Sequence, residues 1–289
     1  MRIKMVYFKL NIRFWGVMMK RSNRLVVLTD FFLENPRKHI QLPYFVELCH
    51  TTKSSISEDL DIINDVFEEQ GLGYLQRSTG AGGGVKYIPE FEVDKSELFL
   101  EELRQKLADP SRILPGGYLY MSDLLGDAKI VREIGRVFAS AFSKMDIDVV
   151  VTVATKGIPL AYAVASFLNV PVVIARRDPK VTEGSSVSIN YVSGSSRKIQ
   201  TMVLTKRSLK DGANVCIIDD FMKAGGTING MISLLAEFNA HVKAVGVLVE
   251  ADDEDEERIV TNYTSLVKVS KVDMLQKKIE IQPGNIASL

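Results

Sequence analysis

The sequence contains few of the side chains that bind metals or form cross-links. Its 289 residues include two cysteines and three histidines. Cys49 and Cys216 stand in apolar surroundings far apart in the sequence, which predicts buried free thiols of a reducing compartment and no disulfide. Since the histidines and cysteines form no cluster with metal-ligand spacing, we expect no metal site built from these side chains.

The sequence also lacks net charge and long apolar runs. Lys and Arg total 36, and Asp and Glu total 36, so any binding of nucleic acid requires a local basic patch. In residues 1–18 basic side chains interrupt every apolar run, so no span of ~20 residues can cross a bilayer. No small-residue cleavage site follows them, which argues against a secretory signal. We therefore expect a cytoplasmic protein without membrane contact.

Residues 1–18 have two interpretations. Either translation of the natural protein begins at Met18 or Met19 and this segment is a start-site extension, or the segment is a real amphipathic arm. The chain is 46% hydrophobic and 25% charged, a composition typical of globular proteins, and its length suffices for two modest domains. Its patterns divide it into residues 19–90 and 91–289.

The first domain is predicted to contain three helices and a hairpin. Apolar residues at helical spacing predict helices over residues 20–35, from Pro43 onward, and over residues 51–71. The third helix is expected to begin at a capping box formed by Ser55 and Glu58. Two strand-like segments around a glycine-rich turn follow. This order is typical of a winged helix-turn-helix domain.

In such a domain the third helix presents its first turns to the major groove of DNA. Those turns carry short hydroxyl side chains and one lysine, which suit contacts with phosphates and base edges. Residues 1–29 contain seven Lys/Arg and no acid, and further basic residues flank the glycine-rich turn. The candidate DNA-binding residues are Arg21, Arg24, Thr52, Lys53, Ser54, Ser55, Ser57, Arg77 and Lys86. The alternative is a small helical domain that serves as an oligomer interface.

Strands and helices alternate in residues 91–289. Four runs rich in β-branched residues predict parallel strands that are buried on both faces. They lie at residues 146–154, 170–177, 213–220 and 242–250. The alternation predicts an α/β domain with an open, mostly parallel sheet. Ligands of such sheets bind beyond the carboxyl ends of the strands.

The stretch VCIIDDFMKAGGTINGM, residues 215–231, places two adjacent acids between a strand and a helix. Residues 224–227 would open the helix without bulky side chains, so their amides form a cradle for phosphate. Asp219 and Asp220 would repel a phosphate and should face neutral hydroxyl groups. A phosphorylated ribose satisfies both demands. The alternative is that the acids are helix caps and the glycine pair is an ordinary turn.

Further basic residues stand near the same edge of the predicted sheet. Lys156 lies in a glycine turn after the first strand, and residues 176–210 carry eight Lys/Arg against two acids. These positive charges could bind additional phosphate groups. The inferred ligand is a ribose with a 5-phosphate and more phosphate besides.

These motifs resemble those of the type I phosphoribosyltransferases. VCIIDDFMKAGGT resembles their phosphoribosyl-pyrophosphate (PRPP) motif, TVATKGIPLA resembles their pyrophosphate loop, and residues 178–202 occupy the place of their flexible loop. With a winged helix in front, the chain from about Met19 resembles the PurR-type family of purine operon repressors of Gram-positive bacteria. KSSISEDL, GGVKYIP and RILPGGY support this resemblance, and only residues 1–18 fall outside it.

The resemblance implies a homodimeric repressor that binds paired operator sequences in double-stranded DNA upstream of purine genes. PRPP would be an effector that weakens DNA binding, and a purine nucleotide or guanosine alarmone could compete for its site. The implied contacts are Asp219 and Asp220 with the ribose hydroxyls, Ala224, Gly225, Gly226 and Thr227 with the 5-phosphate, and Thr155, Lys156 and Gly157 with the pyrophosphate and its Mg²⁺.

Lys223 bears on catalysis. At the corresponding position the hypoxanthine-guanine enzymes of this superfamily have an aspartate that acts near the base, and a charged lysine cannot accept a proton. We therefore expect an effector site, including Lys223 and Tyr118, without catalytic residues. The alternatives are an active phosphoribosyltransferase whose first domain only dimerises, and an activator that PRPP assists. Tyr118 and Tyr120 would either stack on the ligand or pack between domains, and the tail KKIEIQPGN predicts no base-binding hood.

Overall fold

The computed structural model describes residues 19–80, 82–178, 184–192, 199–252 and 258–288. The chain divides into two compact units. Unit 1 contains residues 1–70 and 74–87, and unit 2 contains residues 71–73 and 88–289. The predicted boundary after residue 90 lies close to this division, whereas the predicted start-site extension, residues 1–18, lies outside the described residues.

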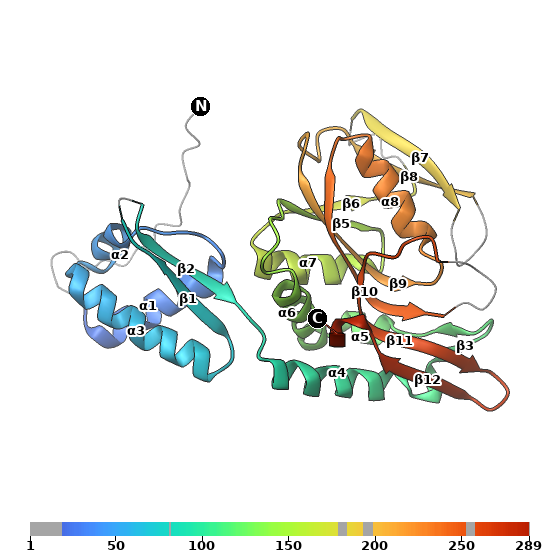
Figure 1. Ribbon diagram of the computed structural model, residues 1–289, viewed down its shortest axis with the longest axis horizontal. Helices are drawn as coiled ribbons and strands as arrows, with labels where there is room; N and C mark the ends of the chain where they lie inside the picture. Colours follow the sequence, from blue (N-terminus) through green and yellow to red (C-terminus); the bar gives the residue numbers. More distant parts are fainter. Residues whose placement is uncertain (1–18, 81, 179–183, 193–198, 253–257, 289) are drawn as a thin grey trace. The chain divides into compact units, whose positions relative to one another are not determined.

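Unit 1 has the three helices and the hairpin of a winged helix, as the sequence predicts (Figure 1). Its elements are α1 (Arg21–Glu34), α2 (Leu42–Cys49), α3 (Lys53–Glu69), β1 (Gly73–Ser78) and β2 (Gly84–Pro89). Ile40 adds an antiparallel bridge to Val85 of the hairpin. The helices pack on one another through fully buried side chains, among them Phe32, Phe45 and Leu60.

The start of α3 differs from the predicted capping box. The helix begins at Lys53, and the hydroxyl of Thr52 accepts a hydrogen bond from the amide of Ser55 at 3.2 Å. Thr52 is therefore the N-cap, three residues before the predicted one, because its side chain already satisfies a free amide of the first turn.

Unit 2 is an α/β domain. Before its sheet begins, the chain forms α4 (Val93–Leu107), η1 (Pro110–Arg112), β3 (Ile113–Leu114), β4 (Tyr118–Leu119), α5 (Ser122–Gly126) and α6 (Ala128–Ala141). The later elements are β5 (Val149–Val153), α7 (Gly157–Leu168), β6 (Val172–Ala175), β7 (Ser186–Val192), β8 (Ile199–Thr205), β9 (Asn214–Met222), α8 (Gly226–Ala236), β10 (His241–Ala251), β11 (Thr264–Asp273), β12 (Lys278–Pro283) and η3 (Asn285–Ser288).

The described part of unit 2 contains a six-stranded sheet in the order β12-β11-β10-β9-β5-β6. All neighbouring strands are parallel except β12, which is antiparallel to β11. The four predicted strands are confirmed as β5, β6, β9 and β10. Sequence analysis missed β11 and β12. The basic segment expected as a flexible loop contains the antiparallel strands β7 and β8, and its residues 179–183 and 193–198 lie outside the described residues.

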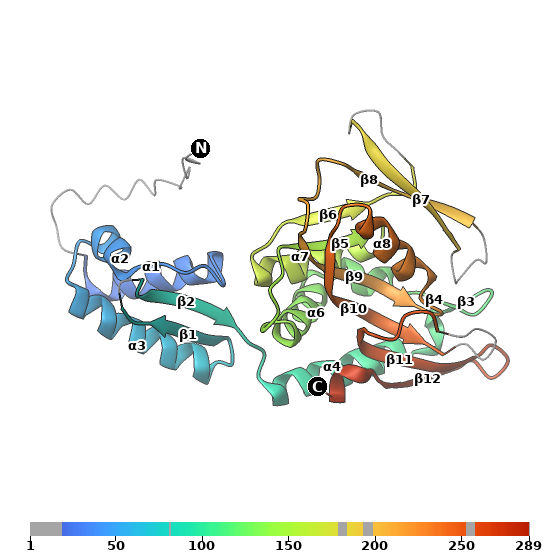
Figure 2. The same ribbon diagram turned by 45° about the horizontal axis from the view of Figure 1, so that its top comes forward.

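Helices cover both faces of this sheet (Figures 1 and 2). Helices α6 and α7 pack on one face with side chains such as Val150 and Ile218. Helix α8 and the β7–β8 hairpin pack on the other face, where Val151 and Ile217 point. The alternation of neighbouring residues between the two cores explains why the strands are apolar throughout. Among the described residues, no helix has both the length and the apolar character needed to cross a membrane.

A buried ion pair ties α1 to α3 in unit 1. Arg24 is 7% exposed and Asp59 is fully buried. The Arg24 guanidinium donates to both carboxylate oxygens, through Nε to Oδ2 at 2.6 Å and through Nη2 to Oδ1 at 3.3 Å. Its remaining Nη1 donates to the Met19 carbonyl at 2.9 Å, and Arg21 also reaches Asp59, at 3.1 Å. The charges are therefore compensated within the core.

Removing one partner of such a pair leaves the other charged and buried. We predict that Asp59→Ala lowers the free energy of unfolding of unit 1 by about 3–5 kcal/mol. The measurement is hydrogen exchange of the α3 amides under native conditions. The control is Glu58→Ala, whose side chain is 67% exposed and lies 3.6 Å from Arg21, so its loss should cost no more than about 1 kcal/mol. Equal effects of the two substitutions would contradict the prediction.

Candidate functional site

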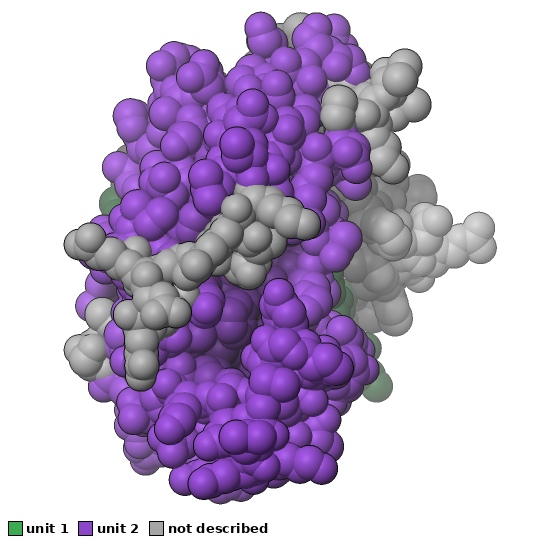
Figure 3. Space-filling model, turned by 90° about the vertical axis from the view of Figure 1, so that its right-hand side faces the viewer, with its two compact units in different colours: residues 1–70, 74–87 green, residues 71–73, 88–289 purple. Residues whose placement is uncertain are grey.

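The carboxyl ends of β5 and β9 lie side by side in the sheet of unit 2. The two strands pair in parallel, with Val151 opposite Ile217, so the turns that follow them meet at one edge. Figure 3 shows that this face of the unit is hollowed. The cavity has a volume of about 1140 Å³.

The structure brings the predicted effector-site residues together at this cavity. Those that line it are Thr155, Lys156, Asp219, Asp220, Lys223, Ala224, Gly225, Gly226, Thr227 and Tyr118. Gly157 is buried and lies at the first residue of α7, beneath the lining residues.

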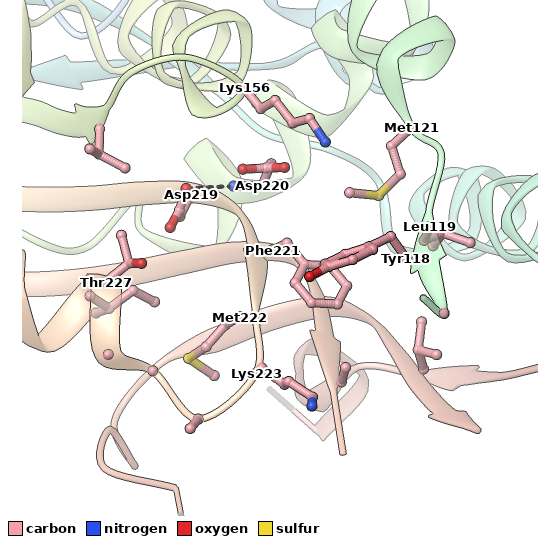
Figure 4. A pocket seen from close by; sticks show the side chains of 18 of the residues that line it. Tyr118, Leu119, Met121, Lys156, Asp219, Asp220, Phe221, Met222, Lys223 and Thr227 are labelled. Carbon is pink, nitrogen blue, oxygen red and sulfur yellow. Dashed lines mark hydrogen bonds between the residues drawn. The ribbon is translucent and has the colours of Figure 1, made fainter. Parts of the chain in front are cut away.

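Two adjacent carboxylates lie at the end of β9. Asp219 is 4% exposed, and its Oδ1 accepts a hydrogen bond from the amide of Asp220 at 3.0 Å (Figure 4). Burial and the neighbouring charge of Asp220 raise the pKa of Asp219 well above its usual value, and Arg177 opposes this shift. Burial also raises the pKa of Asp220, against the opposing charge of Lys156. A ligand that donates hydrogen bonds to these acids will therefore favour their ionised forms.

A cradle of backbone amides follows the acids. Residues 224–227 form the turn into α8, and Gly225 has a φ of +89°, which favours glycine. A Cβ atom at Gly225 would lie 3.1 Å from Cγ2 of Val260, so the structure leaves little room for a side chain. Amides at the start of a helix with no side chain in front of them suit a phosphate group.

The turn after β5 packs tightly against a side chain of β5 itself and lies beside β9. A Cβ atom at Gly157 would lie 2.2 Å from Oγ1 of Thr152 and 3.4 Å from Oδ1 of Asp219. Oγ1 of Thr152 is buried and has no hydrogen-bond partner among the residues that the structure describes. Glycine at position 157 thus allows the start of α7 to pack against the side chain of Thr152, next to Asp219.

The wall opposite the acids was predicted only in part: Tyr118 was expected in the effector site, whereas residues 269–272 were not. We call residues 114–119 and 269–272 the hood, because both segments line the cavity from outside the sheet's central strands. Tyr118, 58% exposed, lines the cavity from the first segment, and Phe221 lines it from β9 (Figure 4). Gly116 and Gly117, which both have positive φ, form the turn of the first segment. The second segment gave no clear signal, because the sequence of β11, TSLVKVSKVD, does not alternate regularly between apolar and polar residues.

Arg112 anchors the first hood segment at its base. Its guanidinium donates to both carboxylate oxygens of Asp123, at 2.7 and 2.8 Å, and also to the carbonyls of Lys106 and Tyr120. These bonds raise the pKa of Arg112 and lower that of Asp123. The β3–β4 hairpin is therefore attached firmly on the side away from the cavity.

The start of α3 in unit 1 is open, as expected for a DNA-binding helix. Thr52, Lys53 and Ser54 are exposed, while Ser55 and Ser57 are half-buried. The remaining candidates lie on neighbouring elements: Arg21 is exposed on α1, Lys86 is half-buried on β2, and Arg77 of β1 pairs with Asp61 at 2.6 Å and donates to the Ser57 carbonyl.

The prediction that Arg24 contacts DNA is wrong. Its side chain lies in the core of unit 1, and its guanidinium is occupied by Asp59 and the Met19 carbonyl. Arg24 precedes Leu28 and Phe32 by four and eight residues, so it belongs to the buried stripe of α1. The helical spacing contained this information.

The packing at Gly157 yields a direct test. We predict that Gly157→Ala forces the turn after β5 to move and lowers the stability of unit 2 by about 1–3 kcal/mol, the usual range for overpacking. Thermal unfolding would measure this loss. Gly126→Ala is the control, because a Cβ atom at Gly126 meets nothing within 4 Å. A Gly157→Ala variant as stable as the control would show that the turn has room to spare.

Comparisons with known proteins agree with this division into two units. Residues 20–89 match the family described as "Bacterial purine repressor, N-terminal", and residues 122–280 match "Phosphoribosyl transferase domain". A crystal structure of adenine phosphoribosyltransferase from Thermoanaerobacter pseudethanolicus superimposes with a TM-score of 0.50 and 21% identity, covering 58% of this chain and 99% of that one. This likeness shows the fold of unit 2.

Two curated relatives match along nearly the whole chain. The purine biosynthesis transcriptional repressor PurR of Bacillus subtilis is 60% identical over 92% of this chain and 93% of its own length. The purine biosynthesis transcriptional activator PurR of Lactococcus lactis is 46% identical over 93% of this chain and 98% of its own length. The chain therefore belongs to the PurR family of bacterial purine repressors.

Proposed function

We propose that this protein is a DNA-binding regulator of purine biosynthesis genes, and that it represses them until PRPP weakens its hold on the operator. The observation that carries the proposal is the presence of two features in one chain: an open recognition helix in unit 1, and a cavity with two acids and a phosphate cradle in unit 2. The Bacillus subtilis relative is named a repressor, which supports repression as the direction of regulation.

PRPP fits the chemistry of the cavity. Asp219 and Asp220 accept hydrogen bonds from the ribose hydroxyls, which favours their ionised forms. Residues 224–227 hold the 5-phosphate through their amides, and residues 155–157 hold the pyrophosphate. Mg²⁺, which prefers a few carboxylate and phosphate oxygens and keeps several waters, would neutralise the pyrophosphate close to these acids. The cavity volume leaves space for a base-sized group under the hood, so a purine nucleotide or guanosine alarmone is a proposed competitor.

Lys223 argues against transfer chemistry. It lines the cavity just before the cradle, where a charged ammonium group donates hydrogen bonds but cannot accept a proton from a purine. We infer that unit 2 senses PRPP without consuming it. The rival function is an active phosphoribosyltransferase, favoured by the phosphoribosyltransferase match over residues 122–280. It would consume PRPP when a purine base is supplied.

For DNA binding, we propose that the first turn of α3 enters the major groove. Thr52, Lys53 and Ser54 are exposed there, and Arg21, Arg77 and Lys86 would contact phosphates. A homodimer would place two such helices on paired half-sites. The Lactococcus lactis relative is named an activator, so activation of the same genes is the second candidate function.

The central prediction concerns DNA binding with and without PRPP. We expect tight binding to DNA upstream of purine genes, weakened at least tenfold by magnesium-PRPP, which corresponds to about 1.4 kcal/mol of differential affinity. Asp219→Asn should bind the same DNA but lose the response, because an amide cannot accept the ribose hydroxyl bonds as the ionised acid does. Fluorescence anisotropy measures both.

Asp211→Asn, an exposed acid elsewhere on unit 2, is the matched control and should respond as the parent does. Tightening of DNA binding by PRPP would support the activator instead. Absence of DNA binding, together with PRPP-dependent loss of a purine base, would replace the proposal with the enzyme.

The raised pKa values of the two acids predict proton release on binding. Because Asp219 and Asp220 hold protons more readily in the free protein, a ligand that requires their ionised forms lowers their pKa. Affinity for PRPP should therefore rise as the pH rises through these raised values and level off above them. Calorimetry in two buffers of different ionisation enthalpy measures the released protons, and Asp219→Asn should release fewer. Equal release by both proteins would show that Asp219 is not a source of the protons.

A further inference from the structure

A second group of polar side chains lies beside the cavity, on β10, on β11 and on the segment between them. The carboxylate of Glu250 is 4% exposed and has three donors. Arg258 donates through Nη1 at 2.6 Å, Ser265 donates through Oγ at 2.9 Å, and the hydroxyl of Tyr263 donates to the same oxygen as Arg258. A buried carboxylate is thus satisfied entirely by side chains of the following segment and strand.

Arg258 is held on several sides. Beyond Glu250, its Nη2 donates to the carbonyl of Ala251 at 3.2 Å and lies 3.7 Å from the carboxylate of Asp252. Its guanidinium also lies 5.3 Å from the centre of the Tyr263 ring, within reach of a cation–π interaction. Because the guanidinium of Arg258 is both hydrogen-bonded and close to the Tyr263 ring, the side chain has little freedom to move.

The two residues after Arg258 touch the phosphate cradle. The amide of Ile259 donates to the carbonyl of Ala224 at 2.9 Å. Val260 is 6% exposed, and its side chain fills the space that a Cβ atom at Gly225 would need. Residues 258–260 therefore form a wedge between the Glu250 cluster on one side and the cradle on the other.

We propose that Glu250 is a positioning residue for the phosphate cradle: by fixing Arg258, it holds the wedge against Ala224 and Gly225. The inference rests on the proposed function, which supplies the ligand, a ribose 5-phosphate group. The physical reason is the composition of the cradle. A turn of Ala224, Gly225 and Gly226 has almost no side chains of its own to fix it, so its amides converge on an anion only if a neighbour restricts them.

A purely structural role for Glu250 makes a different prediction. If the cluster merely joined β10 to β11, its loss would weaken the whole sheet. Every ligand contact in the cavity would then lose affinity to a similar degree. If Glu250 positions the cradle, the effect concentrates at residues 224–227 and spares the turn at residues 155–157, which another strand carries.

The first experiment is amide hydrogen exchange of the ligand-free full chain. Glu250→Gln preserves the shape of the side chain but removes the charge that fixes Arg258, and Tyr263→Phe is a milder variant that removes one donor. Both should accelerate exchange in residues 224–229, by roughly tenfold for Glu250→Gln, within the range seen for residues that act through a neighbour. The control is Val267→Ala, a fully buried position on β11 outside the cluster. It should lower overall stability without selective exchange at the cradle.

The second experiment separates the two ends of the ligand. Magnesium-PRPP binding is measured by calorimetry, with ribose 5-phosphate and magnesium pyrophosphate as separate competitors. Glu250→Gln should weaken ribose 5-phosphate roughly tenfold and leave pyrophosphate within about twofold of the parent.

Unchanged exchange at residues 224–229 in both variants, or the same acceleration in Val267→Ala, would overturn the inference. Equal weakening of both competitors would also overturn it. Failure of the parent protein to bind PRPP would instead refute the proposed function, and the exchange measurement would still decide whether Glu250 positions the turn.

Discussion

Two adjacent carboxylates, one buried and one half-buried, lie at the end of β9 and are the constraint on which unit 2 depends. Burial and the charge of Asp220 raise the pKa of Asp219, and burial raises the pKa of Asp220, so both acids favour a partner that donates hydrogen bonds. The cradle four residues later favours an anion. A single molecule can bind the acids and the cradle together only if it carries hydroxyls and a phosphate a short distance apart. This is the chemical basis for proposing a phosphorylated ribose.

The residues around the acids separate the hydroxyl-binding acids from the phosphate-binding cradle. Gly157 lets the start of α7 pack against Thr152 of β5, while the positive φ of Gly225 directs the chain into α8. The cradle itself has small side chains, and its stiffness must come from neighbours such as Val260. The site thus combines a rigid sheet edge with turns that are shaped by what packs behind them.

Local sequence patterns predicted the parts of this structure that depend on local physics. Buried parallel strands are apolar throughout, so β5, β6, β9 and β10 and the polar residues at their ends were recognisable. Tyr118 of the first hood segment was expected at the site, but residues 269–272 were missed because β11 and β12 form a partly exposed antiparallel edge with a weak apolar signal. Specific side-chain pairs could not be predicted, because no local pattern indicates that Glu250 accepts a hydrogen bond from Arg258. Arg24 was wrongly predicted to contact DNA because its charge was given more weight than its position in the buried stripe of α1.

We propose that the cavity of unit 2 and the DNA-binding surface of unit 1 are energetically coupled. Coupling between two binding sites is reciprocal, so DNA must change PRPP affinity by the same factor by which PRPP changes DNA affinity. The most direct test is calorimetry of magnesium-PRPP binding to the protein alone and to the protein saturated with operator DNA. The account predicts that DNA weakens PRPP binding by the factor found in the anisotropy titrations. The same PRPP affinity with and without DNA would contradict it, because the cavity would then have no influence on the operator.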